Sequence, residues 1–182
     1  PEPYLNNRRL FCPRGKMIGG SSAHNGMVFV RGNRNDYERW KNFGLKSWSY
    51  DKVLPYFKKI ENWSGGENQY RGSLGELPVN QSKNNNPLFK AFLGASSEAG
   101  HKINPDMNGE YQEGFGMFDT TIHNGERASA SKYYLNPAKK RKNLNIFSNS
   151  FVEKIIFEGK KAIGIEVKIK NKVKKIYAEK EL

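Results

Sequence analysis

A run of small residues beside a histidine is the part of this sequence best suited to chemistry. Residues 19–26 read GGSSAHNG, and a basic pair, Arg14 and Lys16, precedes them. Glycines let a backbone adopt positive φ or come close to another group, and the N–H groups of such a loop can point at an anion. The run therefore predicts a loop that approaches a phosphate-bearing ligand, with a purely structural glycine turn as the alternative.

The other generic signatures of chemistry are absent. No G-K-[ST] follows the glycines as in a Walker loop, and no GxGxxG occurs in the chain. The three dispersed histidines and one cysteine give no metal-ligand spacing. His101 is expected on the surface after a helix, and His123 in a loop, with a substrate contact as its alternative. His24 is thus the histidine that adjoins the candidate loop.

The chain is strongly basic, and much of the charge lies near its C-terminal end. It carries 31 Lys and Arg against 18 Asp and Glu, a formal net charge of +13. Residues 139–182 hold 13 basic and 5 acidic residues, which places +8 there. Their lysines alternate with apolar residues, which is typical of the solvated face of a sheet. This pattern argues against a nucleic-acid partner, and a module that binds nucleic acid or an anionic surface is kept as the rival function.

Cysteine content and hydropathy bear on the compartment. Cys12 is the only cysteine, which excludes an internal disulfide and favours a reducing compartment; we expect a buried, inert thiol. No run is long enough to span a membrane. The predicted location is the cytoplasm, with peripheral membrane association as the alternative.

The periodicity of apolar residues predicts a mixed α/β fold, α+β within this chain. A short helix is expected behind Asp36 as its N-cap, and MVFV (27–30) is either a short strand or the start of a helix. Further helices are expected over 49–63, over 87–100 with Asn86 as N-cap, and over 127–138, where Pro137 ends the last one.

The rest of the chain is expected to be loops and strands. Residues 64–86 are polar and predict a long surface excursion, and 101–126 predict a loop and an extended stretch. The tail predicts an antiparallel meander. Its strand candidates are 144–148, 151–157 and 162–170, with a fourth at 173–179.

The order of residues around the glycine run resembles a known family. Residues 13–40, PRGKMIGGSSAHNGMVFVRGNRNDYERW, resemble the first signature of the glucose–methanol–choline (GMC) family of flavin oxidoreductases. Residues 106–138 resemble the family's middle segment and 143–167 its later strand pair, so the resemblance covers essentially the whole chain. The positions that match the signature are Arg14, Gly19, Gly20, Ser21, Ser22, Asn25, Met27, Arg31, Gly32 and Asp36.

The resemblance implies FAD as the cofactor and assigns residues to it. The residues beside the pyrophosphate and ribityl chain are Gly19, Gly20, Ser21 and Ser22. Those near the isoalloxazine ring, where backbone N–H groups stabilise the reduced form, are Asn25, Gly26, Met27 and Val28. Val152 matches the position whose backbone contacts adenine, with an ordinary core valine as the alternative.

His24 has a special place in this comparison. Some family members read HN here, and that histidine is bonded to the 8α-methyl carbon of the flavin, whereas others hold FAD without a covalent bond. His24 is therefore a candidate flavin tether. A partly buried histidine bonded to a loop carbonyl is the alternative.

The resemblance also implies an activity. Choline-oxidising members are most similar, so we expect part of an FAD-dependent dehydrogenase that passes hydride from a primary alcohol, with choline favoured, to flavin N5. An oxidase, or a dehydrogenase of another alcohol, is the alternative. A GxGxxG segment is expected before Pro1 and the catalytic histidine beyond Leu182. No catalytic residue is therefore assigned within the chain, and alone it is expected to be inactive.

The same resemblance divides the chain into three segments. Residues 1–40 are expected in the flavin-proximal part of the FAD-binding domain. Residues 41–138 are expected to contribute in part to the substrate domain, and 139–182 to form a β-meander of the FAD-binding domain.

Overall fold

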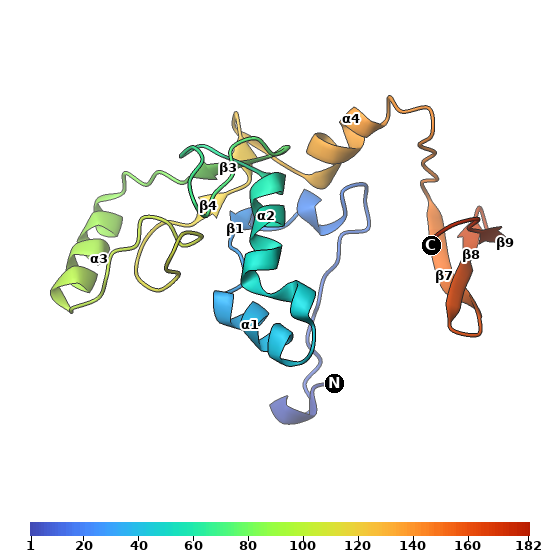
Figure 1. Ribbon diagram of the computed structural model, residues 1–182, viewed down its shortest axis with the longest axis horizontal. Helices are drawn as coiled ribbons and strands as arrows, with labels where there is room; N and C mark the ends of the chain where they lie inside the picture. The colour runs from blue at the N-terminus through green and yellow to red at the C-terminus, as the bar shows by residue number, and fades with distance from the viewer. The chain divides into compact units, whose positions relative to one another are not determined.

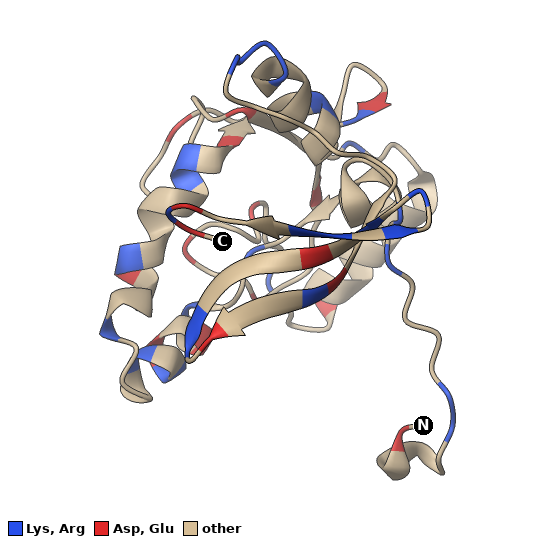
Figure 2. Ribbon diagram, turned by 90° about the vertical axis from the view of Figure 1, so that its right-hand side faces the viewer, with Lys and Arg blue, Asp and Glu red and all other residues tan.

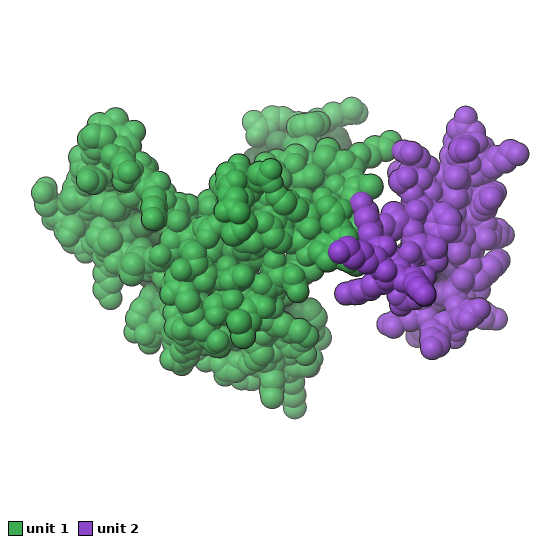
Figure 3. All heavy atoms as spheres, turned by 90° about the horizontal axis from the view of Figure 1, so that it is seen from above, with its two compact units in different colours: residues 1–138 green, residues 139–182 purple.

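The chain folds into two compact units. The computed structural model describes residues 1–182, and they divide into residues 1–138 and residues 139–182 (Figure 3). The first unit contains all the α-helices and two small sheets, and the second is a three-stranded sheet. The mixed α/β fold expected from the sequence is confirmed.

The first unit contains four α-helices (Figure 1). Short 3-10 turns cover Pro3–Leu5, Gly20–Ala23 and Lys46–Trp48, and a π-helical turn covers Ser131–Leu135. The α-helices are α1 (Arg34–Asn42), α2 (Tyr50–Ile60), α3 (Pro87–Glu98) and α4 (Asn136–Ala138). The last of these passes through Pro137 before ending, so the expected stop at that proline is one residue early.

The start of α1 differs from the expectation. Asn33, not Asp36, is its N-cap, and the Asn33 side chain accepts a hydrogen bond from the backbone N–H of Asn35. Asp36 instead lies in the first helical turn, where its negative charge complements the helix dipole. Both residues are good N-caps, and the sequence does not separate them.

The buried side of α1 and α2 is aromatic. The ring of Tyr37 packs edge-on against Trp40 and Phe57, with centroids 5.4 and 5.8 Å apart. Tyr50 is buried at the start of α2, as the helical spacing predicts. The helix ends at Ile60 rather than Trp63, because the next three residues pair as a strand.

Helix α3 forms as predicted. The side chain of Asn86 accepts from the N–H of Leu88, Pro87 takes the first helical position, and Gly100 adopts φ 83° just beyond the end. Each of these is a known helix boundary signal.

Gly94 lies inside α3 and supplies a first prediction. It is exposed, and a Cβ built on it meets no atom within 4 Å. Gly94→Ala is therefore expected to raise the free energy of unfolding by about 0.5–1 kcal/mol, because alanine loses less backbone entropy in a helix. Urea denaturation of the full-length protein checks this, and a destabilised variant would contradict it.

The first unit has a four-stranded sheet and a hairpin. The sheet order is β1 (Val28–Phe29), β4 (Asp119–Thr120), β3 (Leu77–Gln81) and β2 (Glu61–Trp63). Strands β2 and β3 run parallel and the other pairs antiparallel. Figure 1 shows β1, β4 and β3 close together. The hairpin joins β5 (Ile122–His123) to β6 (Glu126–Arg127).

The expectation of a surface excursion over residues 64–86 is wrong in its middle. This stretch contains β3, and Arg71 and Val79 within it are fully buried. The stretch read as exposed because it is polar, but Arg71 is buried against charged partners that lie outside it in the sequence.

The second unit is the expected antiparallel meander. Its strands are β7 (Ser150–Glu158), β8 (Lys161–Ile169) and β9 (Lys172–Tyr177). The candidate strand at 144–148 is wrong, since those residues are in no strand, and the fourth candidate is real and forms β9. Lys170 and Asn171 both have positive φ, as a two-residue hairpin turn requires. Lysines recur along these strands (Figure 2).

Two expectations about single features can be checked directly. Cys12 is exposed, so the expected burial of its thiol is wrong. The neighbouring residues of its loop are exposed as well, so Cys12 lies in a segment with no buried residue close to it in the sequence. No helix in the chain combines the length and the apolar character that crossing a membrane requires.

Candidate functional site

The glycine loop is closely folded on itself. A Cβ on Gly15 would lie 2.4 Å from the carbonyl carbon and oxygen of Gly20, so only glycine allows this approach. Gly19 has φ 92°, in the left-handed region that favours glycine. The loop therefore needs glycine at both positions for different reasons.

The two serines hold this shape. The hydroxyl oxygen of Ser21 accepts from the N–H of Gly15 at 3.1 Å. The hydroxyl of Ser22 donates to the Gly19 carbonyl and accepts from the N–H of Ala130 at 3.0 Å. The loop is thus closed internally and also fastened to a segment more than a hundred residues later.

Residues 25–27 are held from the opposite strand and hairpin. Met27 has φ 61°, a costly conformation for a residue with a side chain. Its carbonyl accepts from the backbone N–H and the hydroxyl of Thr121, at 2.8 and 3.3 Å. Asn25 accepts from Arg127 through both its backbone and its side-chain oxygen. The surrounding contacts therefore fix a strained segment.

The hairpin that carries Arg127 has a clear sequence origin. Asn124 and Gly125 form a two-residue turn with φ 50° and 75°, the Asn-Gly pairing typical of such hairpins. A hydrogen bond from Lys132 and the charge of that lysine lower the pKa of Glu126, so Glu126 stays ionised and paired with Lys132. Glu126 therefore pairs with Lys132 and not with Arg127, and the Arg127 guanidinium bonds to Asn25 of the loop.

The exposed part of the loop has a free hydrogen-bond donor and apolar residues on either side of it in the sequence. The N–H of Gly26 donates to no atom of the protein, and a Cβ on Gly26 would meet nothing within 4 Å. About half of each of four flanking apolar side chains is exposed: Met17, Ile18, Val28 and Val30.

His24 lies on this exposed surface. Its side chain is exposed and makes no hydrogen bond, so the alternative of a partly buried histidine bonded to a loop carbonyl is wrong. Its backbone N–H donates to the Ser21 carbonyl at 3.2 Å, which fixes where the side chain leaves the loop.

Beneath β1 and β4 lies a buried network of charges. The guanidinium of Arg71 is fully buried and bonds to Glu61 at 3.2 Å, Asp106 at 2.5 Å and Asp119 at 2.7 Å. It also lies 4.2 Å above the ring centre of Trp63. Arg31 donates to Glu61 as a second buried cation.

The network keeps Arg71 charged. Desolvation lowers the pKa of Arg71, but the hydrogen bond to Asp119 and the charges of Glu61, Asp106 and Asp119 outweigh it, so the net pKa is raised. The network joins the end of α2, the loop at 104–109 and strand β4.

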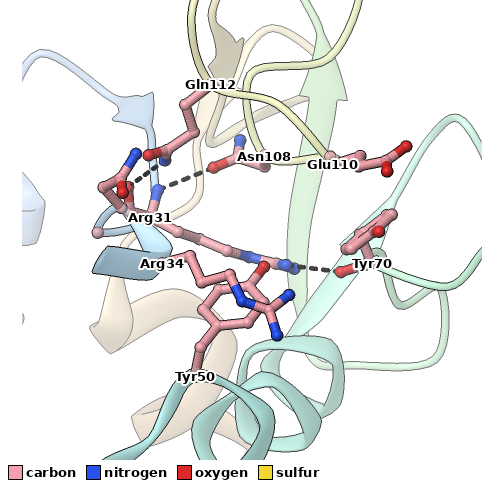
Figure 4. Close-up of a pocket in the computed structure, with 10 residues that line it drawn as sticks. Arg31, Arg34, Tyr50, Tyr70, Asn108, Glu110 and Gln112 are labelled. Carbon is pink, nitrogen blue, oxygen red and sulfur yellow. Dashed lines mark hydrogen bonds between the residues drawn. The ribbon is translucent and has the colours of Figure 1, made fainter. Parts of the chain in front are cut away.

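A small polar cavity adjoins Arg31 (Figure 4). Its volume is about 50 Å³, enough for water but not for a cofactor ring. The backbone N–H of Arg31 donates to Asn108 at 2.8 Å, and its carbonyl accepts from Gln112 at 2.8 Å. The Arg31 guanidinium donates to the Tyr70 carbonyl at 2.6 Å. We interpret this cavity as part of the contact region in which Asn108 and Gln112 hold the chain directly after β1.

The remaining residues singled out from the sequence lie elsewhere. Arg14 and Lys16 are exposed, and Arg14 donates to the neighbouring Pro13 carbonyl. Val152 belongs to the second unit, on β7, and is 48% exposed, so the alternative of a core valine is wrong. His101 is exposed, as expected. His123 is exposed too, but it lies on strand β5 and not in the expected loop.

Sequence reasoning missed the residues that hold the loop. Arg127, Thr121 and Ala130 contact it from about a hundred positions away, and nothing local marks them. The one available signal was the Asn124–Gly125 pair, which predicts a hairpin. That hairpin would place Arg127 on its second strand. Arg71 had no signal, since its surroundings read as a polar loop.

Comparison with known proteins is consistent with this geometry. A family model described as GMC oxidoreductase matches residues 3–182. The chain is 48% identical over 182 residues to an oxygen-dependent choline dehydrogenase of Brucella anthropi and 46% identical to one of Sinorhizobium fredii. Each match covers all of this chain and 33% of the relative, so the chain spans about a third of the length of these curated relatives.

Solved structures share the fold. A pyridoxine 4-oxidase from Mesorbium loti superposes with a TM-score of 0.85 at 30% identity, over 91% of this chain and 33% of its own. An FAD-dependent oxidoreductase from Chaetomium thermophilum gives a TM-score of 0.86 at 27% identity, over 96% of this chain and 33% of its own. Because the family model matches nearly the whole chain, the chain belongs to the GMC oxidoreductase family.

Proposed function

We propose that this chain is the flavin-contacting part of an FAD-dependent dehydrogenase of primary alcohols, with choline as the favoured substrate. The observation that carries the proposal is the loop at 19–28, whose free Gly26 N–H, together with the exposed side chain of Val28, suits a flavin ring. The relatives named choline dehydrogenase support the choice of substrate.

The binding roles follow the loop. We assign the pyrophosphate and ribityl chain to residues 19–22, where glycines remove side-chain bulk. We assign the isoalloxazine ring to residues 25–28, where the Gly26 N–H is available as a donor. Val152, exposed on β7, keeps its proposed backbone contact with adenine. When bound, FAD supplies the hydride acceptor.

The segments of the chain then have separate tasks. We propose that residues 1–40 belong to the flavin-proximal part of the FAD-binding domain and 139–182 to its β-meander. Residues 41–138 partly contribute to the substrate domain. A cytoplasmic location is part of this proposal, and the exposed single cysteine, which forms no disulfide within the chain, is consistent with it.

A second candidate is an oxidase or a dehydrogenase of another alcohol. The 30% identity to a pyridoxine 4-oxidase favours it. The full-length protein assayed with choline and with other primary alcohols, using oxygen or a quinone as acceptor, distinguishes the two. Absence of bound flavin, together with steeply salt-dependent retention on DNA, would instead support the rival basic module.

We further propose that His24 is bonded to the flavin. Its exposed side chain, free of hydrogen bonds, leaves the loop beside Asn25 and Gly26. The bond joins an imidazole nitrogen to the 8α-methyl carbon, each losing a proton, and the two electrons pass to the flavin ring.

The expected result for the tether is an all-or-none change in colour. When the full-length protein is precipitated with acid, the yellow flavin should remain with the pellet, and with His24→Ala it should pass into the supernatant. His101 serves as control, because it is an exposed histidine outside the loop, and His101→Ala should keep the colour in the pellet. Flavin released from the unmodified protein would contradict the bond and leave FAD binding standing.

A further inference from the structure

The guanidinium of Arg127 contacts the loop mainly through Asn25, with one longer hydrogen bond to the Ser22 carbonyl at 3.5 Å. Its Nη1 donates to the backbone oxygen of Asn25 at 2.6 Å and to the side-chain oxygen of Asn25 at 2.7 Å. The same side-chain oxygen accepts from the N–H of Met27 at 3.2 Å. One charged group therefore fixes both the main chain and the side chain of Asn25.

This contact also determines where the next N–H points. The chain has no cis peptide bond, and in a trans peptide the C=O and N–H point in opposite directions. Because Arg127 holds the Asn25 carbonyl, the N–H of Gly26 in the same peptide unit points away from Arg127. That N–H has no protein acceptor, and the space beside Gly26 is open.

The charge of Arg127 adds to the effect. A cationic donor on the carbonyl polarises the peptide, which makes its N–H a stronger hydrogen-bond donor. No other side chain of the protein bonds to Asn25, and the nearby Lys132 is paired with Glu126. Thr121 fixes Met27, two residues further on, so the Asn25 carbonyl itself is held by Arg127 alone.

We propose that Arg127 is a positioning residue for the reaction: it orients and polarises the Asn25–Gly26 peptide so that the Gly26 N–H stabilises negative charge on the reduced flavin ring. This inference rests on the proposed function. Arg127 itself contacts neither flavin nor substrate in this role, and it acts through the loop.

The test compares three variants of the full-length protein with the unmodified protein. Arg127→Met removes the donor and the charge, and Arg127→Lys keeps the charge with a shorter donor. Arg39→Met removes the same charge from an exposed position on α1 and serves as control. The measurements are flavin content, flavin midpoint potential, kcat and KM.

The expected result is a change in the flavin, not only in stability. Arg127→Met should lower the midpoint potential and reduce kcat by about tenfold or more, as loss of an oriented donor does, with KM little changed. Flavin content should stay close to that of the unmodified protein, since Ser22 and Thr121 still hold the loop. Arg127→Lys should recover part of the midpoint potential and part of kcat. Arg39→Met should match the unmodified protein in both quantities.

The outcomes separate the two proposals. Flavin present with an unchanged potential and kcat in Arg127→Met would overturn this inference and leave the proposed function intact. No flavin in the unmodified protein would overturn the proposed function and this inference with it. If Arg127→Met fails to fold, Arg127→Lys decides, because a potential equal to that of the unmodified protein at reduced kcat would show a merely structural role.

Discussion

Replacing Arg71 by methionine is expected to lower the free energy of unfolding by about 3–5 kcal/mol, the range for breaking a buried ion pair from one side. Methionine keeps the apolar stem but leaves Glu61, Asp106 and Asp119 without their shared cation. Glu61 is fully buried and Asp119 is 7% exposed, so water cannot replace the hydrogen bonds that the Arg71 guanidinium gives them. The urea unfolding midpoint of the full-length protein should fall accordingly.

An exposed arginine gives the matched control. Arg34 pairs with Asp51 at 3.0 Å, but the two side chains are 55% and 71% exposed. Arg34→Met should therefore cost no more than about 1 kcal/mol, as exposed pairs do. Equal losses in Arg71→Met and Arg34→Met would show that the buried network is not what holds β4.

Gly15→Ala adds only one methyl group, but we expect it to weaken flavin binding strongly. The new Cβ would lie 2.4 Å from the Gly20 carbonyl and 2.7 Å from the Ser21 N–H, both backbone atoms that cannot move aside alone. Forcing them apart costs about 1–3 kcal/mol, or roughly tenfold to a hundredfold in binding. The fraction of purified full-length protein that carries flavin should fall to match.

The same substitution elsewhere isolates the cause. Gly94→Ala adds the same methyl group in open space on α3 and should leave the flavin content unchanged. If Gly15→Ala bound flavin as fully as Gly94→Ala, residues 19–22 would not be the binding segment.

Elements with local signals could be predicted from the sequence. Asn86 and Pro87 mark the start of α3, and the alternation in the tail gives the meander, because caps and periodicity are set by neighbouring residues. The approach of the glycine run to a phosphate-bearing ligand stays a prediction, whereas its backbone does require glycine at Gly19, as the alternative of a structural turn supposes.

Features that depend on distant partners could not be predicted. Arg71 lies in a polar stretch, and only the fold shows that Glu61 and Asp119 surround it. Cys12 is exposed although cysteine is usually buried, because burial depends on what packs over a residue and not on its type. Arg127 is 102 residues from Asn25, so its role has no trace in either local sequence.

The long separation of these contacts has a consequence for the order of folding. Asn25 obtains its partner 102 residues later, and Ser22 its partner 108 residues later. At a synthesis rate of about 5–20 residues per second, these partners follow the loop by roughly 5–20 s. These two contacts of the loop therefore cannot form until residue 130 has left the ribosome, although the hydrogen bonds within the loop can form earlier.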